Sequence, residues 1–382
     1  MNTPLINHIK SSFLEIFNVE PVMIFSPGRI NIIGEHTDYS DGFVFPAAIN
    51  KGIVTAIQKN SAEFCTAVAA DVNEIFEFSL NNIQSIPSGG WRNYVLGVVA
   101  EIQKNGIKLE AFNVVFGGDI PVGSGLSSSA ALENSIVFGL NELFSLGLSK
   151  KEMILISQQA EHNYVGVRCG IMDQYASMFG KEKSALFLDC RTIEAKEIYI
   201  DLKEYELLLI NTNVKHSLSE SAYNNRRSVC EKVASLLNIP ALRDASEESL
   251  LNIKSKISIE DYQKGLFVIQ ENKRVEKAAE TLKNNDILTL GKLLFESHNG
   301  LQNQYKVSCD ELDFLVNKAK ENPDVVGARM MGGGFGGCTI NIIKKSAIAS
   351  FSKEISLLYK EKFKKECSIY NIELSEGTHI IG

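Results

Sequence analysis

The stretch Pro121-Val-Gly-Ser-Gly-Leu-Ser-Ser-Ser-Ala-Ala-Leu-Glu133 follows a predicted strand at residues 112–116 and enters a predicted helix at residues 127–144. Gly123 and Gly125 let the backbone turn sharply and approach a ligand closely. The serines stand at the helix N-terminus, where unpaired N–H groups and the helix dipole favour an anion. The stretch therefore predicts a phosphate-binding loop; the alternative is a serine cap after a glycine turn. It is not a Walker A loop, because no G-x-x-x-x-G-K-[ST] occurs in the chain.

A second glycine-rich stretch, Gly332-Gly-Gly-Phe-Gly-Gly337, lies between strand-like runs at residues 326–331 and 338–343. It matches G-x-G-x-x-G formally, but a dinucleotide-binding fold needs a helix after the glycines. The pattern predicts a tight loop whose backbone approaches another group closely. A plain turn between two strands is the alternative.

A third stretch reads Gly28-Arg-Ile-Asn-Ile-Ile-Gly-Glu-His-Thr-Asp-Tyr-Ser-Asp-Gly42. Short acceptors crowd beside a histidine in a predicted loop, which suits recognition of several hydroxyls, as on a sugar. Arg29 is placed to serve an anion or to pair with a carboxylate. A metal site and a solvated acidic loop are the alternatives, although no regular ligand spacing such as H-E-x-x-H occurs here.

Two further carboxylates, Glu161 and Asp173, lie on predicted helices beyond the phosphate loop. Two acids near a phosphate site indicate one magnesium ligand and one base. Taken alone, each is better explained as an ordinary helix-end acid. The combination of anion loop, polyol pocket and acids favours the chemical interpretation.

The composition limits the classes of protein. The chain has 382 residues, 45% hydrophobic and 22% charged, which fits two globular domains or one large one. A net charge of −7 argues against a general nucleic-acid or membrane-surface binder. The seven cysteines form no C-x-x-C pair, so we expect reduced thiols in a cytoplasmic protein. We find no signal peptide and no apolar run long enough to span a membrane.

Hydrophobic periodicity predicts the remaining elements. A capping box at Ser149 opens a helix to about residue 164. A strand at residues 22–25 is predicted to end at Ser26-Pro27-Gly28. Further strands are expected at 51–57, 64–70, 185–189 and 205–211, and further helices at 4–17, 91–104, 172–179, 218–236, 262–282, 286–297, 308–320 and 346–364. We place the domain boundary near residue 200, giving domains 1–200 and 201–382, because the second half is richer in helix.

The three motifs together resemble the galactokinase family, one of the GHMP kinases with the homoserine, mevalonate and phosphomevalonate kinases. The resemblance covers nearly the whole chain, and the motifs stand in the family's order. Residues 28–42 are the most specific, because the other GHMP kinases lack the Gly-Glu-His-Thr-Asp block. The resemblance implies a mixed α/β (α+β) fold of two domains with the active site between them.

The resemblance also implies roles for individual residues. It makes Asp173 and Arg29 catalytic, and it makes Ser129 and Glu161 the magnesium ligands. Sugar contacts fall on Glu35, His36, Thr37, Asp38, Gly170 and Tyr223. ATP contacts fall on Gly123, Ser124, Gly125, Leu126, Ser127, Ser128, Ser129 and Trp91, with Tyr94 also near the adenine. Many relatives carry a serine near the adenine where this chain has Ala69-Ala70, which removes that side-chain contact.

The implied reaction is transfer of the ATP γ-phosphoryl group to the C1 hydroxyl of galactose, with Mg²⁺. Asp173 would accept or orient the hydroxyl proton, and Arg29 would keep Asp173 ionised. The expected partners are therefore galactose and ATP, with no nucleic acid, membrane or obligatory protein partner.

Two alternatives stand beside this reading. One is a sister kinase for N-acetylgalactosamine or arabinose, although the intact Gly34-Glu-His-Thr-Asp-Tyr39 favours galactose. The other is a non-catalytic galactose sensor, as in fungal relatives that lost a Ser-Ala pair from the phosphate loop. Here Ser127-Ser-Ser-Ala-Ala131 is complete, which favours an enzyme.

Overall fold

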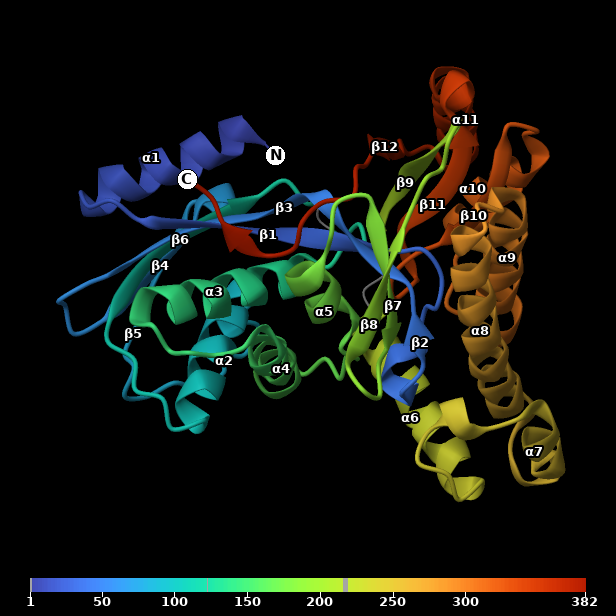
Figure 1. The fold of residues 1–382 in the computed structure, drawn as a ribbon, viewed down its shortest axis with the longest axis horizontal. Helices are drawn as coiled ribbons and strands as arrows, with labels where there is room; N and C mark the ends of the chain where they lie inside the picture. The colour runs from blue at the N-terminus through green and yellow to red at the C-terminus, as the bar shows by residue number, and fades with distance from the viewer. Residues whose placement is uncertain (1, 122, 216–218) are drawn as a thin grey trace.

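Three sheets organise the chain, shown as a computed structural model in Figure 1, which describes residues 2–121, 123–215 and 219–382. The largest sheet has the order β13-β1-β3-β6-β4-β5, and only its β4–β6 pair is parallel. Its strands are β1 (Val22–Asn31), β3 (Pro46–Lys59), β4 (Cys65–Ala69), β5 (Glu74–Phe78), β6 (Phe112–Gly118) and β13 (His379–Ile380).

Helices cover both faces of this sheet (Figure 1). Successive strand residues face opposite ways, so Met23 and Phe25 pack with α1 while Ile24 joins the core on the other face. That second core carries the helices that matter for the site. The helices are α1 (Thr3–Phe17) on one face and α2 (Trp91–Lys104), α3 (Ser128–Phe144), α4 (Lys150–Ala160) and α5 (Met172–Phe179) on the other.

A second sheet, of order β10-β11-β9-β12, is antiparallel throughout and builds the other half of the molecule. Its strands are β9 (Tyr205–Lys215), β10 (Val325–Met330), β11 (Gly336–Lys344) and β12 (Ser368–Asn371). Helices pack on both of its faces. α8 (Ile259–Lys283) and α9 (Ile287–Gly300) cover one face, and α10 (Asp310–Glu321) and α11 (Ile348–Phe363) cover the other. α6 (Ser219–Leu236) and α7 (Glu247–Asn252) pack against α8 instead.

A small sheet of β2 (Phe43–Val44), β7 (Ser184–Asp189) and β8 (Glu194–Tyr199) lies between the two halves (Figure 1). The proposed boundary at residue 200 falls between β8 and β9, which belong to different sheets. The chain then returns to the first sheet, where β13 pairs with β1. The division into residues 1–200 and 201–382 stays a prediction.

Several predicted elements differ from the structure. The strand at 22–25 does not end at Pro27: β1 continues to Asn31, because a bulge between Pro27 and Arg29 absorbs the irregular turn residues. The helix opened at Ser149 ends at Ala160 and continues as a π-helical turn, Glu161–Val165. β5 and β8 were not predicted. Both are edge strands: glutamates interrupt the apolar residues of β5, and most side chains of β8 are exposed. The mixed α/β fold is confirmed.

The cysteines and the helices also bear on the sequence predictions. All seven cysteines are free thiols. Among the described residues, we find no helix with the length and apolar character needed to cross a bilayer.

Candidate active site

The stretch that we predict to bind phosphate joins β6 to α3, and we call it the phosphate loop. Gly123 and Gly125 have φ angles of 71° and 73°, in the left-handed region that favours glycine. Ser127 precedes the first turn of α3, but its hydroxyl makes no cap. It donates instead to Oδ2 of Asp173 at 2.5 Å. The serine-cap alternative is therefore wrong, and the side chain of Ser127 leaves the first N–H groups of α3 for another acceptor.

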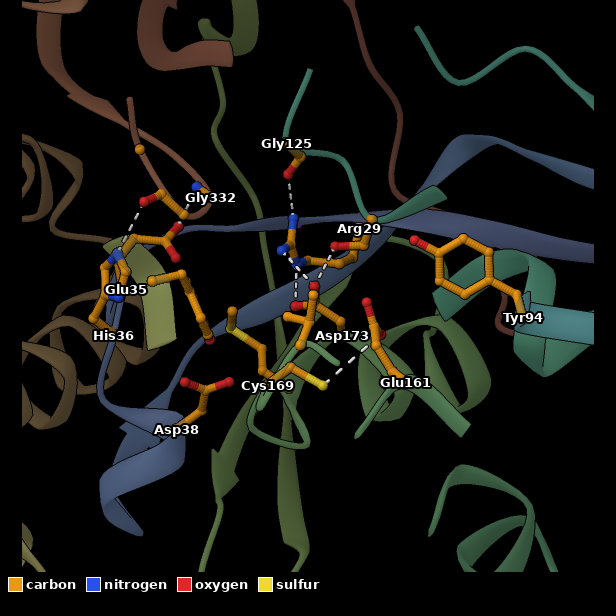
Figure 2. Close-up of a pocket in the computed structure, with 16 residues that line it drawn as sticks. Arg29, Glu35, His36, Asp38, Tyr94, Gly125, Glu161, Cys169, Asp173 and Gly332 are labelled. Atoms are coloured by element: carbon orange, nitrogen blue, oxygen red, sulfur yellow. Dashed lines mark hydrogen bonds and ion pairs between the residues drawn. The ribbon is translucent and has the colours of Figure 1, made fainter. Parts of the chain in front are cut away.

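Asp173, in the first turn of α5, accepts from three donors. Arg29, on β1, donates from Nε to Oδ1 and from Nη2 to Oδ2, both at 2.8 Å, and Ser127 is the third donor. Nη1 of Arg29 donates to the carbonyl oxygen of Gly125 at 2.5 Å, so one guanidinium joins the phosphate loop to the carboxylate (Figure 2). Such bidentate, charge-assisted bonds hold the carboxylate firmly.

The electrostatics of Arg29 follow from this arrangement. Burial alone would lower the pKa of Arg29, but the carboxylates of Asp173, Glu35 and Asp38 outweigh it and raise that pKa. Arg29 is only 4% exposed. It is therefore a permanent positive charge inside the site, near acids from two parts of the chain.

Glu35 is anchored to the second half of the molecule. Its Oε1 accepts from the main-chain N–H of Gly332 at 2.9 Å and from Nη2 of Arg329 at 3.1 Å. Arg329, on β10, is completely buried and also donates to the carbonyl oxygens of residues 31, 32 and 330. We call residues 32–42, between β1 and β2, the signature loop, and residues 332–337, which lead from β10 into β11, the third glycine loop. Glu35 thus ties the signature loop to the third glycine loop by a hydrogen bond and to β10 by a buried ion pair.

Asp38 presents a buried carboxylate whose Oδ1 accepts from the N–H of Tyr39 at 3.0 Å. Burial, aided by the charge of Asp173, raises the pKa of Asp38 to about 7. Gly170 lies directly against this carboxylate, and a Cβ at Gly170 would overlap it. The loop before α5 therefore needs glycine at this position to come so close to Asp38.

We expect Asp38→Asn to stabilise the ligand-free protein above pH 7. The pKa of Asp38 rises on folding from 3.8 to about 7, so the buried carboxylate increasingly destabilises the fold between those values. The substitution should gain on the order of 2–4 kcal/mol at pH 8, and less as the pH falls towards 4. Thermal unfolding at a series of pH values measures this. Asp41→Asn, on the exposed part of the same loop, is the control. Equal effects of the two substitutions would contradict the account.

His36 and Tyr223 form the aromatic part of the site. The His36 ring lies 5.3 Å from that of Tyr223 and 5.8 Å from that of Tyr39, measured between centroids. Nδ1 of His36 is 2.7 Å from the Tyr39 hydroxyl, and Nε2 is 3.2 Å from the carbonyl oxygen of Gly333. Both ring nitrogens are therefore already bonded within the protein.

Glu161 opens the π-helical turn after α4 and is buried beside α5. Its Oε2 accepts from Nε2 of Gln174 at 3.0 Å, and the Ser129 hydroxyl hydrogen-bonds to the same carboxylate. Burial and the nearby charge of Asp173 raise the pKa of Glu161 to about 7. A hydroxyl and a buried carboxylate next to a second acid are oxygen donors of the kind that Mg²⁺ prefers. The residues present thus fit the predicted magnesium site.

These groups surround one cavity of about 280 Å³ between the two halves of the molecule (Figure 2). Many of the side chains predicted to take part in catalysis or binding line this cavity. The lining includes Arg29, Glu35, His36, Asp38, Gly125, Ser127, Glu161, Asp173 and Tyr223 from the predicted set, and Tyr94 from the predicted adenine region. It also includes the third glycine loop at residues 332–334, so that the loop is more than a plain turn.

Other predicted residues lie outside this lining and keep their roles as predictions. Thr37 is fully buried, and its hydroxyl donates to the carbonyl oxygens of Gly34 and Phe43. The Trp91 indole N–H donates to Glu74 at 2.7 Å. The rest are Gly123, Ser124, Leu126, Ser128, Ser129 and Gly170.

Sequence reasoning missed some residues that build the site. Arg329 escaped notice because it sits in a strand-like apolar run, although a lone arginine in such a run is itself a signal. Gln174, next to Asp173, bridges toward Glu161 through a side chain that no motif includes. Val167, Cys169 and Met172 line the cavity from the loop before α5 and its first turn.

Comparison with known proteins adds independent findings. Three protein-family models match the chain. The family described as "Galactokinase galactose-binding signature" matches residues 11–59, "GHMP kinases N terminal domain" matches residues 93–181, and "GHMP kinases C terminal" matches residues 278–360. Galactokinase of Thermotoga neapolitana is 40% identical over 93% of this chain and 99% of its own length. The chain belongs to the galactokinase family. A galactokinase of Clostridium beijerinckii is 39% identical over 99% of both chains.

Solved structures of other proteins resemble the structure of this chain. The crystal structure of Lactococcus lactis galactokinase complexed with galactose matches with a TM-score of 0.94, at 32% identity, over 98% of this chain and 99% of that one. The mevalonate kinase of Methanococcus jannaschii matches with a TM-score of 0.66 at 19% identity, over 93% and 99%. The second match shows the shared GHMP kinase fold alone.

Proposed function

We propose that this galactokinase-family chain transfers the γ-phosphoryl group of ATP to the C1 hydroxyl of D-galactose, giving galactose 1-phosphate and ADP. One observation carries the proposal. Asp173 is held by Arg29 and Ser127 at the place where the phosphate loop meets the acidic signature loop. A donor bound at the first and an acceptor bound at the second would therefore meet beside this carboxylate.

The sugar side of the cavity is acidic. Asp38 is a buried carboxylate, and Oε1 of Glu35 is already occupied by Gly332 and Arg329, which leaves Oε2. Carboxylate oxygens accept hydrogen bonds from several hydroxyls at once. Tyr223 supplies an aromatic wall beside them. This combination suits a neutral, hydroxyl-rich substrate of monosaccharide size.

The phosphate side is built from backbone and a helix end. The N-terminus of α3 presents N–H groups and the positive end of its dipole, and these stabilise phosphate oxygens. The third glycine loop lies against the phosphate loop, since a Cβ built on Gly332 would lie 3.2 Å from Cα of Gly125. When bound at Ser129 and Glu161, Mg²⁺ would supply positive charge that neutralises the transferring phosphoryl group.

Asp173 then has two tasks for the acceptor. It orients the C1 hydroxyl for in-line attack, and it accepts the proton as the new P–O bond forms. Three donors hold the carboxylate rigidly, so positioning is its larger contribution. Arg29 holds it in place and offers positive charge near the reacting group.

An assay of ADP release with a panel of sugars tests this function. We expect turnover with galactose and little with N-acetylgalactosamine, arabinose or no sugar. Faster turnover with N-acetylgalactosamine or arabinose than with galactose would show that the faster sugar is the substrate. Binding of galactose by calorimetry without ADP release would instead indicate a non-catalytic sensor.

Removing Glu161 should weaken the metal site selectively. Glu161→Ala deletes one of two proposed oxygen ligands, so we expect the affinity for Mn²⁺, measured by electron paramagnetic resonance with ATP present, to fall at least ~10-fold. Galactose affinity without nucleotide should change little. Glu142→Ala, exposed near the end of α3, is the control. Wild-type Mn²⁺ affinity in folded Glu161→Ala would remove Glu161 from the site.

A further inference from the structure

The hydrogen bonds of His36 fix which ring nitrogen carries the proton. The partner of Nε2 is the Gly333 carbonyl oxygen, which can only accept, so Nε2 carries the proton. Nδ1 of the neutral ring is then an acceptor, and the Tyr39 hydroxyl donates to it at 2.7 Å. Burial lowers the pKa of His36 to about 3, which keeps the ring neutral. The structure therefore specifies one tautomer.

The same logic extends away from the cavity. The hydroxyl oxygens of Tyr39 and Tyr305 are 2.7 Å apart. Tyr39 gives its single proton to His36, so Tyr305 must donate to Tyr39. Cys230 Sγ lies 3.3 Å from the Tyr305 hydroxyl and donates its S–H in turn. We call Cys230, Tyr305, Tyr39 and His36 the tyrosine relay. Each hydrogen bond in the relay is donated toward His36: from Cys230 to Tyr305, from Tyr305 to Tyr39, and from Tyr39 to His36.

The tyrosine relay is rigidly mounted. Tyr305 is completely buried and closes the π-helical turn Leu301–Tyr305. Its carbonyl oxygen accepts from Nε of Arg226 at 2.9 Å. Two residues later, the carbonyl oxygen of Val307 accepts from the N–H of Phe335, in the third glycine loop, at 2.7 Å. The segment that orients His36 thus also holds the far side of that loop.

We propose that the His36 ring is a positioning group, which the tyrosine relay keeps in the Nε2–H tautomer so that it holds Gly333 and the third glycine loop against the phosphate loop. In this arrangement the ring donates no hydrogen bond to the sugar, and recognition of the hydroxyls falls to the neighbouring carboxylates. Tyr39 and Tyr305 are positioning residues too, although they belong to different halves of the molecule. The inference rests on the proposed function only for assigning the cavity to galactose and ATP.

Nitrogen NMR of protein labelled with ¹⁵N-histidine tests the tautomer directly. We expect, at pH 7, a proton on Nε2 of His36 and none on Nδ1, with the same pattern after galactose is added to saturation. Loss of the signals in His36→Gln assigns them. A proton on Nδ1, or a change of the protonated nitrogen with galactose, would overturn the proposal. The readout needs no turnover, so it stands or fails separately from the kinase activity.

Variants test the consequence for the loop. Tyr39→Phe removes the donor to Nδ1, so we expect mixed His36 tautomers and a KM for ATP raised roughly 10-fold, the scale of one lost buried hydrogen bond. Galactose affinity by calorimetry should change less than ~3-fold. Tyr305→Phe should act in the same direction more weakly, and it repeats the test if Tyr39→Phe does not fold.

Tyr359→Phe is the matched control, because Tyr359 is buried on α11 and its hydroxyl donates to the Thr212 carbonyl oxygen at 2.8 Å, away from the cavity. It should lower the unfolding temperature while leaving the His36 tautomer and the KM for ATP unchanged. A folded Tyr39→Phe with wild-type tautomer and KM would contradict the proposal. A loss of galactose affinity larger than the effect on ATP would also contradict it, since the ring would then act on the sugar.

Discussion

Asp173→Asn should lower kcat by roughly 10²–10⁴-fold, the usual contribution of a positioned general base. The carboxylate accepts from Nε and Nη2 of Arg29 and from Ser127. An amide keeps only one oxygen for these three donors, so it loses orientation as well as the proton acceptor. Because Ser127 belongs to the phosphate loop, we expect a modest change in ATP affinity, within ~10-fold. Single-turnover kinetics with saturating ATP and galactose measures the chemical step.

The controls separate chemistry from helix stability. Asp310, an exposed acid, also lies in the first turn of its helix, α10, and does not line the cavity. Asp310→Asn should leave kcat unchanged. Arg29→Ala should also lower kcat, and the double variant with Asp173→Asn should lose less than the product of the two single effects, because the residues act as one unit. A kcat for Asp173→Asn within about threefold of wild type would reject the catalytic role.

Galactose should be preferred over glucose by at least ~10³-fold in kcat/KM. The two sugars differ only at C4, where galactose carries an axial hydroxyl. A buried carboxylate such as Asp38, with the main-chain N–H of Tyr39 as its bonded donor, gains from a sugar hydroxyl placed on it. It is left underpaired when that hydroxyl points elsewhere, and unpaired buried polar groups are costly. Initial rates with each sugar at saturating ATP give the ratio.

A second measurement locates the origin of this preference. Asp38→Ala should lose most of its galactose affinity by calorimetry while retaining ATP affinity. Asp41→Ala, on the same loop with its side chain paired to Arg191, should retain both. Normal galactose binding to Asp38→Ala would show that the acidic loop is not the sugar pocket, and a selectivity below ~10-fold would show that no buried group reads C4.

Many residues that the sequence singled out line one cavity, whereas the sequence predicted the path of the chain less well. Gly123 and Gly125 indicated the predicted phosphate loop, because the turn needs left-handed backbone angles that glycine adopts readily. The closeness of Arg29 to Asp173, 144 positions apart, came from the family resemblance and not from spacing. The Pro27-Gly28 pair was misread as the end of a strand, since a bulge and a turn share the same residues.

What local patterns could not show were the partners from the second half of the chain. Arg329 pairs with Glu35 across 294 positions, and Tyr305 reaches Tyr39 across 266. Pairs so far apart in the chain leave no periodic pattern in the sequence, because their contact depends on how the sheets pack. Ser127 was a plausible cap until its hydroxyl was seen to donate to Asp173. Only coordinates assign such shared donors.

The position of the new phosphate ester tests the central claim most directly. Incubation with ATP and galactose, followed by ³¹P–¹H correlation NMR of the purified sugar phosphate, identifies the esterified carbon. Our account predicts a phosphorus signal coupled to the anomeric proton, because Asp173 orients the C1 hydroxyl toward the phosphate loop. A phosphorus coupled to the C6 protons, or ATP hydrolysis without any sugar phosphate, would contradict it.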